Sequence, residues 1–326
     1  MNKTFWLLGA WALARALRRS RWDLDGKVVI VTGGARGLGL VLARELARRG
    51  ARVVLAARDT TTLSRAHRAL ARSGAEVLAV RCDVRDRGSV EQLVAAARST
   101  FGRVDALIND AGVMEVGPLE TMTYDDFERS MDTHFFGPLN TMSAVIDEMK
   151  ARREGRILNI ASIGGLVPVP HLAPYSASKA ALVGLSGAFA TELRPFGIQV
   201  TTACPGLMRT GSPSNATFKG RASWEHRWFG WLDAIPLLST RAERAARKLV
   251  DAMERGTPFV MVGRHFRLVH VFSALFPNLF ARLLGLTARL LPGPSSTPRS
   301  ARGYEIGARI SPRTARQNNE LDWAPH

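Results

Sequence analysis

Residues 28–39 read VVIVTGGARGLG, and this stretch carries the strongest structural signal in the 326-residue chain. The continuous apolar, β-branched run at Val28–Thr32 is typical of a buried parallel strand. The glycines that follow allow a tight turn, and apolar residues recur at helical spacing from Leu38 onward. A strand, a glycine turn and a helix in this order predict a phosphate-binding turn, because the N-terminus of the helix then faces the bound anion.

The same alternation of strand and helix continues after this turn. Further strands are predicted at 52–57, 76–81, 104–109, 156–160, 198–203 and 259–262, and helices at 38–49, 60–72, 86–100, 124–152, 174–194 and 241–254. Regular alternation predicts parallel βαβ units, and hence an α/β fold with a Rossmann-type doubly wound parallel sheet. Right-handed crossovers place the ligand site at the carboxyl ends of the strands.

We expect a single domain with extensions at both ends of the chain. Residues 1–25 are predicted to form an N-terminal amphipathic extension, and residues 26–263 the dinucleotide-binding catalytic domain. Within that domain, residues 207–239 form a long segment that interrupts the alternation of strand and helix. Residues 264–292 are a strongly apolar C-terminal segment. Residues 293–326 are rich in Pro, Ser, Gly and Arg, a composition typical of a disordered tail.

The glycine pattern can be specified further. Gly33 lets the chain turn, Gly37 lets the backbone approach the phosphates, and Gly39 lets the helix pack closely on the strand. An ordinary glycine turn is the alternative, and the flanking strand and helix favour cofactor binding. The arrangement T-G-x-x-x-G-x-G resembles the short-chain dehydrogenase/reductase family, from residue 26 to about residue 263. The resemblance implies an oxidoreductase with a nicotinamide cofactor, bound by these glycines together with Arg36 and Leu38.

The second predicted strand bears on the choice of cofactor. It ends at Ala57, where members of the family that use NAD usually carry an acidic residue. Arg58 follows, and Arg36 lies in the glycine turn; guanidinium groups at these places suit the 2′-phosphate of NADP(H). Asp59 is the opposing observation, because an acidic residue here can bind the ribose hydroxyls of NAD, although it can also cap the next helix. We favour NADP(H).

Further cofactor contacts are implied by the same resemblance, at the ends of three other strands. They are Asp83 and Val84 after the third strand, Asn109, Ala111 and Gly112 after the fourth, and Pro205, Gly206 and Thr210 after the sixth. A loop-opening turn is the alternative for the last group. Asp110 departs from the family, which usually has Asn or Ala at that position.

The candidate catalytic residues are Ser162, Tyr175 and Lys179. Tyr175 and Lys179 are four residues apart and so share one face of a predicted helix, while Ser162 ends the preceding strand. A Y-x-x-x-K pair occurs often by chance, but with Ser162 and the glycine turn it resembles the family's catalytic set. The resemblance implies that Tyr175 exchanges a proton with the substrate oxygen and Ser162 hydrogen-bonds that oxygen. It implies that Lys179 binds the nicotinamide ribose and lowers the pKa of the tyrosine, so Tyr175 and Lys179 also contact the cofactor.

His134 occupies the place of an Asn that often belongs to the family's proton relay. Histidine can donate, accept and shuttle protons, so His134 is a candidate fourth catalytic residue. A structural role is equally open.

The resemblance implies that residues 207–239 are the substrate lid, and this lid contains Trp224, Trp228 and Trp231 within eight residues. Aromatic side chains of this size favour an apolar carbonyl or alcohol substrate, such as a lipid, steroid, retinoid or polyketide. A lid that packs on its own core, or a contact between subunits, remains an equal alternative. The resemblance implies a homodimer or homotetramer through the long middle helices.

The formal net charge is +17, most of it from arginine. We favour arginines spread over solvated helix faces, and no nucleic-acid partner is expected because the chain has no nucleic-acid-binding motif. The histidines lack metal-ligand spacing, so no metal site is expected. Cys82 and Cys204 lie in separate apolar stretches, which argues against a disulfide framework and for a reducing compartment.

Both ends of the chain combine apolar residues with arginines. No run of 18 apolar residues occurs, so a spanning helix is not expected. Residues 1–22 and 279–291 suit the interface of a membrane. We therefore expect a cytoplasmic protein with peripheral membrane contact through both termini, although residues 279–291 can also cover the active site or a neighbouring subunit. A non-catalytic dinucleotide-binding protein or a membrane-surface scaffold on the same fold is the alternative function.

Overall fold

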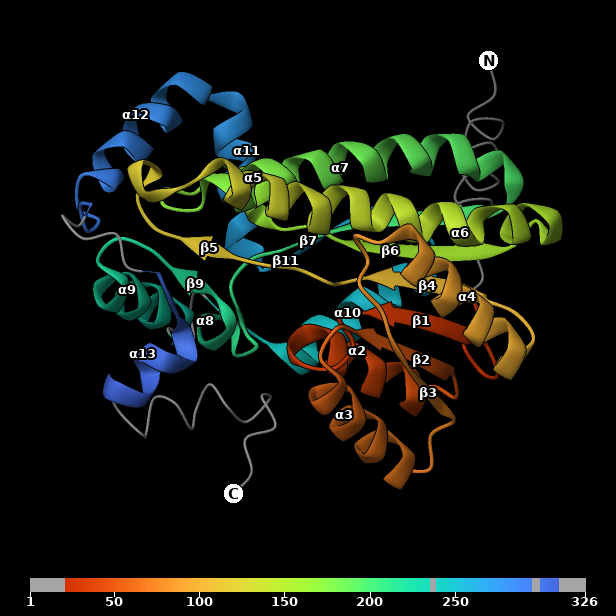
Figure 1. Cartoon of the computed structure of the whole chain (residues 1–326). Helices are drawn as coiled ribbons and strands as arrows, with labels where there is room; N and C mark the ends of the chain where they lie inside the picture. Colours follow the sequence, from red (N-terminus) through yellow and green to blue (C-terminus); the bar gives the residue numbers. More distant parts are fainter. Residues whose placement is uncertain (1–20, 235–238, 295–299, 311–326) are drawn as a thin grey trace, which may run out of the picture.

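The computed structural model describes residues 21–234, 239–294 and 300–310. A seven-stranded parallel sheet forms its centre, in the order β11-β7-β6-β4-β1-β2-β3 (Figure 1). Its strands are β1 (Val28–Thr32), β2 (Arg52–Ala57), β3 (Val77–Arg81), β4 (Ala106–Asn109), β6 (Gly155–Ile160), β7 (Ile198–Pro205) and β11 (Phe259–Val262). Every neighbouring pair in this sheet is parallel. The predicted doubly wound α/β fold is therefore confirmed.

Helices cover both faces of the sheet, and this is why the strands of the sheet are continuous apolar runs. Strand β1 is an example. Val29 and Val31 pack against one layer of helices, while Val28 and Ile30 pack against the other. Successive side chains of a strand point to opposite faces, so a strand covered on both faces needs apolar residues throughout. The first layer comprises α2 (Gly37–Arg48), α3 (Thr60–Arg72) and α10 (Ala242–Glu254), and the second comprises α4 (Arg87–Phe101), α6 (Gly137–Arg152) and α7 (Ala173–Leu193) (Figure 1).

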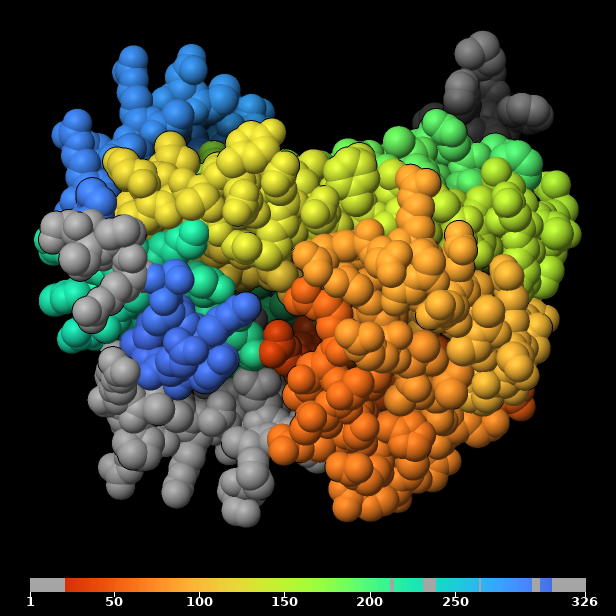
Figure 2. Space-filling model, in the orientation of Figure 1, coloured from red at the N-terminus to blue at the C-terminus, as the bar shows by residue number. Residues whose placement is uncertain are grey.

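The strand order reverses beside β1, because the chain leaves β3 at one edge and returns as β4 on the other side of β1. Ligands of open α/β sheets bind where the order reverses, at the carboxyl ends of the strands. Figure 2 shows a hollow between the N-terminal part of the chain, in red and orange, and the later segments, in green-blue and blue. The carboxyl ends of β1 and β4 are therefore the place where this fold is expected to bind a ligand.

The long middle helix predicted over residues 124–152 is interrupted in the structure. It consists of α5 (Tyr124–Met131), a π-helical turn at Asp132–Phe136 and α6. The N–H of Gly137 donates to the carbonyl of Asp132, five residues earlier, as a π-turn requires. Pro138 follows, and because proline has no N–H and its ring clashes with the carbonyl four residues earlier, a regular α-helix cannot pass through this point.

The predicted lid folds into short elements. They are β8 (Met208–Arg209), α8 (Ser212–Asn215), β9 (Thr217–Phe218) and α9 (Ala222–Ala234). Outside the main sheet, β8 pairs with β10 (Thr240–Arg241). A three-stranded sheet in the order β12-β9-β5 joins the lid to β5 (Glu115–Val116) and to β12 (Ala301–Arg302).

The prediction of a disordered tail over residues 293–326 does not hold for residues 300–310. These residues form β12 and α13 (Gly303–Ile310), and the side chain of Ile306 is buried among lid residues. The reason is tertiary: β9 offers an open edge, and the lid offers an apolar surface, to a segment whose own composition is polar. Residues 295–299 and 311–326 of that prediction, and residues 1–20 of the N-terminal extension, lie outside the described residues.

The apolar C-terminal segment forms two helices, α11 (Arg264–Leu275) and α12 (Pro277–Ala288) (Figure 1). Pro277 separates them, because a proline disfavours a helical conformation of the preceding residue, Phe276. Among the described residues, no single helix is long and apolar enough to span a membrane. The two helices meet such a criterion only as a pair, and that pair is bent by 118°.

Candidate functional site

The glycine turn ends at the open N-terminus of α2. Arg36, the residue before the helix, has an extended backbone and makes no capping side-chain bond, and the first turn of the helix contains no acidic residue. The first N–H groups of a helix lack partners within the helix and attract an anion. This geometry is compatible with the phosphate site that the sequence predicts.

Close packing explains why the turn needs glycine. Gly33 has φ +71°, and a Cβ atom there would lie 2.9 Å from the Cα of Ala111 in the turn after β4. A Cβ at Gly39 would collide with the carbonyl oxygen of Gly33. A Cβ at Gly37 would lie 3.5 Å from the carbonyl oxygen of Thr210, in the lid. The structure thus brings together the predicted residues of the first, fourth and sixth strand ends.

The three charged residues considered for cofactor choice differ in their surroundings. Asp59 caps α3, and its Oδ1 accepts the Thr62 N–H at 2.7 Å. This backbone hydrogen bond is the main reason why the pKa of Asp59 is lowered. Arg58 is exposed at the end of β2, and the exposed Arg36 donates a hydrogen bond to Asn215 of the lid. Two guanidinium groups therefore border the region beyond β2, while the nearby carboxylate is engaged by a helix.

Asp83 and Val84 lie just beyond β3. Asp83 forms an ion pair with Arg85 at 2.6 Å, and the hydrogen bonds from Arg85 lower the pKa of Asp83. Val84 is buried, and its carbonyl accepts the Asn140 Nδ2–H at 3.0 Å. The Arg85 side chain and α6 thus position both residues.

Asn109 has a structural role that its motif did not reveal. Its Nδ2 donates to Asn159 Oδ1 at 2.9 Å, and its Oδ1 accepts from Thr141 at 2.7 Å. Asn159 in turn donates to Ser186 at 3.0 Å. This buried chain of amides and hydroxyls ties β4 to β6, α6 and α7, so the side chain of Asn109 supports the site from within the sheet.

The predicted catalytic residues come together beyond the end of β6. The side chains of Tyr175 and Ser162 are joined by a hydrogen bond. Lys179, one turn further along α7, donates to the carbonyl of Ile160 at 2.7 Å, and its Nζ lies 5.7 Å from the centre of the Tyr175 ring. A Cβ at Gly164 would lie 3.4 Å from Tyr175 Cε1, so the loop after Ser162 packs directly on the tyrosine.

Burial is the largest influence on the pKa values of the ionisable groups at this site. Burial raises the pKa of Tyr175 to about 12, and the hydrogen bond with Ser162 offsets only part of that rise. The Asp110 carboxylate adds to it. Burial lowers the pKa of Lys179 and raises that of Asp110, and the attraction between their opposite charges opposes both shifts. For the Asp110–Lys179 pair, desolvation therefore outweighs the mutual attraction of the two charges.

Asp110 is a functional candidate that the sequence marked only as a departure from the family. Its carboxylate accepts a hydrogen bond from the backbone of Gly39, at the N-terminus of α2. Its own backbone N–H donates to Thr32 at 3.2 Å. Asp110 thus connects the ends of β1 and β4 by hydrogen bonds, and its carboxylate attracts the ammonium group of Lys179 on α7.

His134 lies in the π-helical turn and is fully buried. Its Nε2 accepts the Val113 N–H at 3.1 Å, so the proton of the neutral ring is on Nδ1, which lies 2.8 Å from Ser178 Oγ. The Ser178 hydroxyl in turn donates a hydrogen bond to the Pro174 carbonyl at 2.9 Å. Burial holds the pKa of His134 well below its usual value. A neutral ring with both nitrogens engaged joins the turn after β4 to the helix of Tyr175.

A second buried histidine contact joins the lid to the loop before Tyr175. His171 Nδ1 lies 2.8 Å from Glu225 Oε1 on α9, and Trp228 Nε1 donates to Glu225 Oε2 at 2.7 Å. Glu225 is completely buried. His171 has φ +65°, a left-handed conformation that costs a non-glycine residue energy and that clusters at functional sites. Sequence reasoning had no signal for this link.

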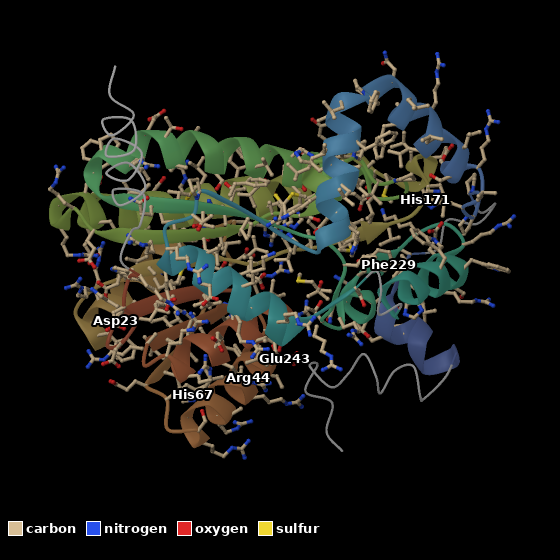
Figure 3. The ribbon with its side chains drawn as sticks, turned by 180° about the vertical axis from the view of Figure 1, so that it is seen from behind. Asp23, Arg44, His67, His171, Phe229 and Glu243 are labelled. Atoms are coloured by element: carbon tan, nitrogen blue, oxygen red, sulfur yellow. The ribbon has the colours of Figure 1, made fainter. Side chains whose placement is uncertain are left out.

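An apolar cluster, formed by lid residues and by neighbouring segments of the chain, packs against Tyr175. The buried cluster comprises Val116, Leu172, Ala216, Phe218, Phe229 and Ile306, and Tyr175 and Trp228 pack against it. Trp224 is 58% exposed, so only one of the two tryptophans with described side chains belongs to this cluster. Figure 3 shows His171 and Phe229 on the side of the molecule that carries α11 and α12, away from Asp23 and His67.

The remaining candidate groups do not add chemistry. Cys82 and Cys204 are free and buried, and burial raises the pKa of the Cys204 thiol to about 12, which leaves it without nucleophilic character. Within the described part of the chain, no group of three or more His, Cys, Asp or Glu side chains is placed to hold a metal ion.

Comparisons with known proteins agree with this geometry. Residues 27–218 match the family described as short chain dehydrogenase. The chain is 31% identical to dehydrogenase/reductase SDR family member 7B of Rattus norvegicus, over 87% of this chain and 89% of that protein. It is 38% identical to the oxidoreductase UcpA of Salmonella typhimurium, over 57% and 71%. A crystal structure of the F189W actinorhodin polyketide ketoreductase with NADPH superposes with a TM-score of 0.67 at 30% identity, covering 75% of this chain and 98% of that one.

Proposed function

Because the chain belongs to the short-chain dehydrogenase/reductase family and is therefore an oxidoreductase, we propose that it uses NADP(H) to interconvert a carbonyl and an alcohol on an apolar substrate. The observation that carries the proposal is the meeting of Ser162, Tyr175 and Lys179 at the carboxyl end of the sheet, beside the glycine turn. A non-catalytic dinucleotide-binding or scaffold protein has no use for this set.

The residues present fit a dinucleotide. Gly33 and Gly37 have positive φ angles, and the N-terminus of α2 leaves backbone N–H groups for a pyrophosphate. Side chains at these glycines would fill the space between the turn, Ala111 and Thr210. The residues that would hold the cofactor are the glycine turn with Leu38, the Asp83–Val84 and Ala111–Gly112 turns, and the Pro205, Gly206 and Thr210 segment.

The preference for NADP(H) rests on Arg36 and Arg58. Their guanidinium groups can bind a 2′-phosphate in two-pronged fashion, whereas a carboxylate there would repel it. Asp59 is engaged as the N-cap of α3, which supports the same choice. The polyketide ketoreductase that resembles this chain was crystallised with NADPH.

The roles of the catalytic residues follow from their protonation. When bound, the nicotinamide supplies or accepts the hydride. A tyrosine whose pKa is about 12 stays protonated near neutral pH, so the Tyr175 O–H can donate its proton to the oxygen of a carbonyl substrate. Ser162 binds the same oxygen, and the positive charge of Lys179 stabilises the phenolate left behind. We assign the reduction direction to neutral pH, and oxidation to alkaline pH.

Two arguments bear on substrate and surroundings. The apolar cluster beside Tyr175 supports an apolar substrate, because such walls bind hydrocarbon while few polar groups fix its orientation. Free buried cysteines support a reducing compartment such as the cytoplasm.

We also propose a homodimer or homotetramer that forms through α6 and α7. These two helices share an outer hollow that is lined by Ile146, Phe189 and Glu192. We further expect peripheral contact with a membrane.

A titration with NADPH and NADH tests the cofactor assignment. Nicotinamide fluorescence should report tight binding of NADPH and weak binding of NADH. Arg58→Gln should weaken NADPH binding roughly tenfold to a hundredfold, the value of a charge-assisted hydrogen bond, and leave NADH binding unchanged. The exposed Arg247, on α10, provides the matched control as Arg247→Gln. Tighter binding of NADH would assign the ribose to Asp59 and contradict the proposal.

A further inference from the structure

The helices α11 and α12 present an apolar surface that nothing else in the described chain covers. Its exposed members are Leu268, Val269, Val271, Leu275, Phe276, Leu279, Leu283, Leu286 and Leu290. Soluble proteins rarely expose contiguous apolar surface of this kind, and where it occurs it marks a contact with a partner or a membrane. We call this set, with Arg267, Arg282 and Arg289, the α11–α12 surface.

The pattern on α12 is the reverse of an ordinary surface helix. Leu279, Leu283 and Leu286, with Leu290 in the turn that follows, are spaced to form one stripe, and they are 49%, 44%, 56% and 85% exposed. A helix on a protein core turns such a stripe inward, yet α12 has no buried residue. The leucine stripe therefore faces away from the protein.

The chain around this surface is entirely basic among its charged residues. Residues 264–292 contain four arginines and no Asp or Glu. Arg282 on α12 and Arg289, the residue that follows the helix, lie three residues after Leu279 and Leu286, so they flank the leucine stripe on one side. Long cationic side chains at the border of an apolar stripe can extend to lipid headgroups while the leucines enter the acyl region.

The α11–α12 pair is anchored firmly to the body of the protein. Phe266 packs with the buried cluster of Ala161, Leu182, Cys204 and Met261, and it lies so close to Gly206 that no side chain fits there. The rings of Phe272 and Phe276 are 5.4 Å apart, and those of Phe272 and Phe280 are 6.1 Å apart, which ties α11 to α12. These contacts hold α11 and α12 against the protein, and so fix the positions of the exposed leucines.

We propose that the α11–α12 surface docks on an anionic lipid bilayer and lies in its interface. Each helix has 12 residues and is about 18 Å long, too short for a hydrocarbon core of about 30 Å. A bend of 118° prevents the pair from forming one straight span. Charge decides against a second copy as the occupant, because two such surfaces would bring arginines together, whereas an anionic surface attracts a protein of net charge +17.

This docking has a consequence for the reaction, and that consequence rests on the proposed function. Phe266, at the start of α11, contacts the Gly206 turn that borders the expected nicotinamide site. Phe229 of the lid and His171 of the loop before Tyr175 lie on the same side of the molecule as α11 and α12 (Figure 3). Docking therefore brings the lid towards the bilayer, from which an apolar substrate can enter.

Co-sedimentation of the full-length protein with vesicles tests the proposal. The vesicles consist of phosphatidylcholine with or without phosphatidylglycerol, at low salt. Binding should need phosphatidylglycerol. Leu279→Glu with Leu286→Glu should abolish it, and Arg282→Gln with Arg289→Gln should weaken it about fivefold for each arginine. The matched controls are Leu119→Glu, at a leucine 63% exposed outside this surface, and Arg247→Gln, and both should bind as wild type.

Three results would overturn the proposal. The first is a wild-type protein that stays in the supernatant with anionic vesicles. The second is binding that the α12 variants leave intact, which would assign it to another part of the chain. The third is a concentration-dependent oligomer that the leucine variants dissociate, which would make the occupant a second copy. NADPH binding and reduction of a water-soluble ketone, measured in the same preparations, report separately on the proposed reaction, and the α12 variants should leave both unchanged.

Discussion

Tyr175 is a weaker acid in this fold than in water, and its neighbours explain why. Burial raises its pKa to about 12, and the Asp110 carboxylate contributes to the rise. The same carboxylate raises the pKa of Lys179 and so favours the charged form of the lysine, against the effect of burial. The sequence predicted that the tyrosine, serine and lysine act together, because their spacing reflects one helix and one strand end. It could not show the effect of Asp110, which depends on how three separate elements meet.

Replacing Asp110 tests this balance. Asp110→Asn removes a negative charge from beside Tyr175, so the pKa of the tyrosine should fall. Oxidation of an alcohol needs the phenolate as its base, and its rate rises with pH towards that pKa. The rise should therefore move to lower pH in the variant, as measured by a pH profile of NADP reduction. Asp125→Asn, at an exposed acid on α5, should keep the wild-type profile. A profile unchanged in Asp110→Asn would exclude the carboxylate from the balance.

His134 offers a second test, because its two possible roles predict different pH effects. Burial lowers its pKa below the usual value of 6.5, so at lower pH the unfolded state binds a proton that the folded state excludes. The free energy of unfolding should be unaffected by this group above about pH 6.5 and should fall as pH drops below it. His134→Asn should lack this component in denaturant titrations between pH 5 and about 7. It should also lose roughly 1–3 kcal/mol of stability at neutral pH, through the bonds to Val113 and Ser178.

A role of His134 in a proton relay would instead affect the pH dependence of turnover. If His134 carried protons, His134→Asn would change the shape of the pH profile of turnover near neutrality. We expect the shape to stay the same, because both ring nitrogens are engaged by structural hydrogen bonds.

At the scale of elements, the lid is held by contacts that sequence patterns do not encode. The sequence predicted β1 and β2 with their observed bounds, because buried strands read directly as apolar runs. It missed the π-helical turn, although Pro138 is a visible cause, and it missed β12 and α13. The second miss involves a partner far along the chain. The pairing of β12 with β9 joins residues 301–302 to residues 217–218.

Glu225 is the residue by which to test the lid. Glu225→Gln removes the charge from the bonds to His171 and Trp228, which hold α9 against the loop before Tyr175. Hydrogen bonds to a buried charge contribute roughly 1.5–3 kcal/mol each, so the lid should loosen. We expect KM for an apolar substrate to rise severalfold, while kcat changes little because no group at the reacting atoms is altered. Glu120→Gln, at an exposed acid outside the lid, serves as the control. A loss confined to kcat would contradict the assignment of Glu225 to the lid.

At the scale of the whole molecule, one sheet organises the site. The reversal of strand order beside β1 brings the glycine turn, Asp110 and α7, the helix of Tyr175 and Lys179, to the same edge. This arrangement was predictable, because alternating strands and helices allow few topologies. The lid, the described part of the tail and the α11–α12 surface gather on one side of that edge (Figures 1 and 3). Their placement was not predictable, because short strands and isolated apolar helices have many possible neighbours.

The most direct test of the account is NADPH oxidation by the wild-type protein and by Tyr175→Phe, with a panel of apolar ketones. The wild type should turn over at least one of them, and Tyr175→Phe should lose roughly a hundredfold to ten-thousandfold of that rate while binding NADPH as tightly. This result would identify Tyr175 as the proton donor of an NADPH-dependent carbonyl reduction. A Tyr175→Phe protein that reduces the same ketone at the wild-type rate would contradict the central claim.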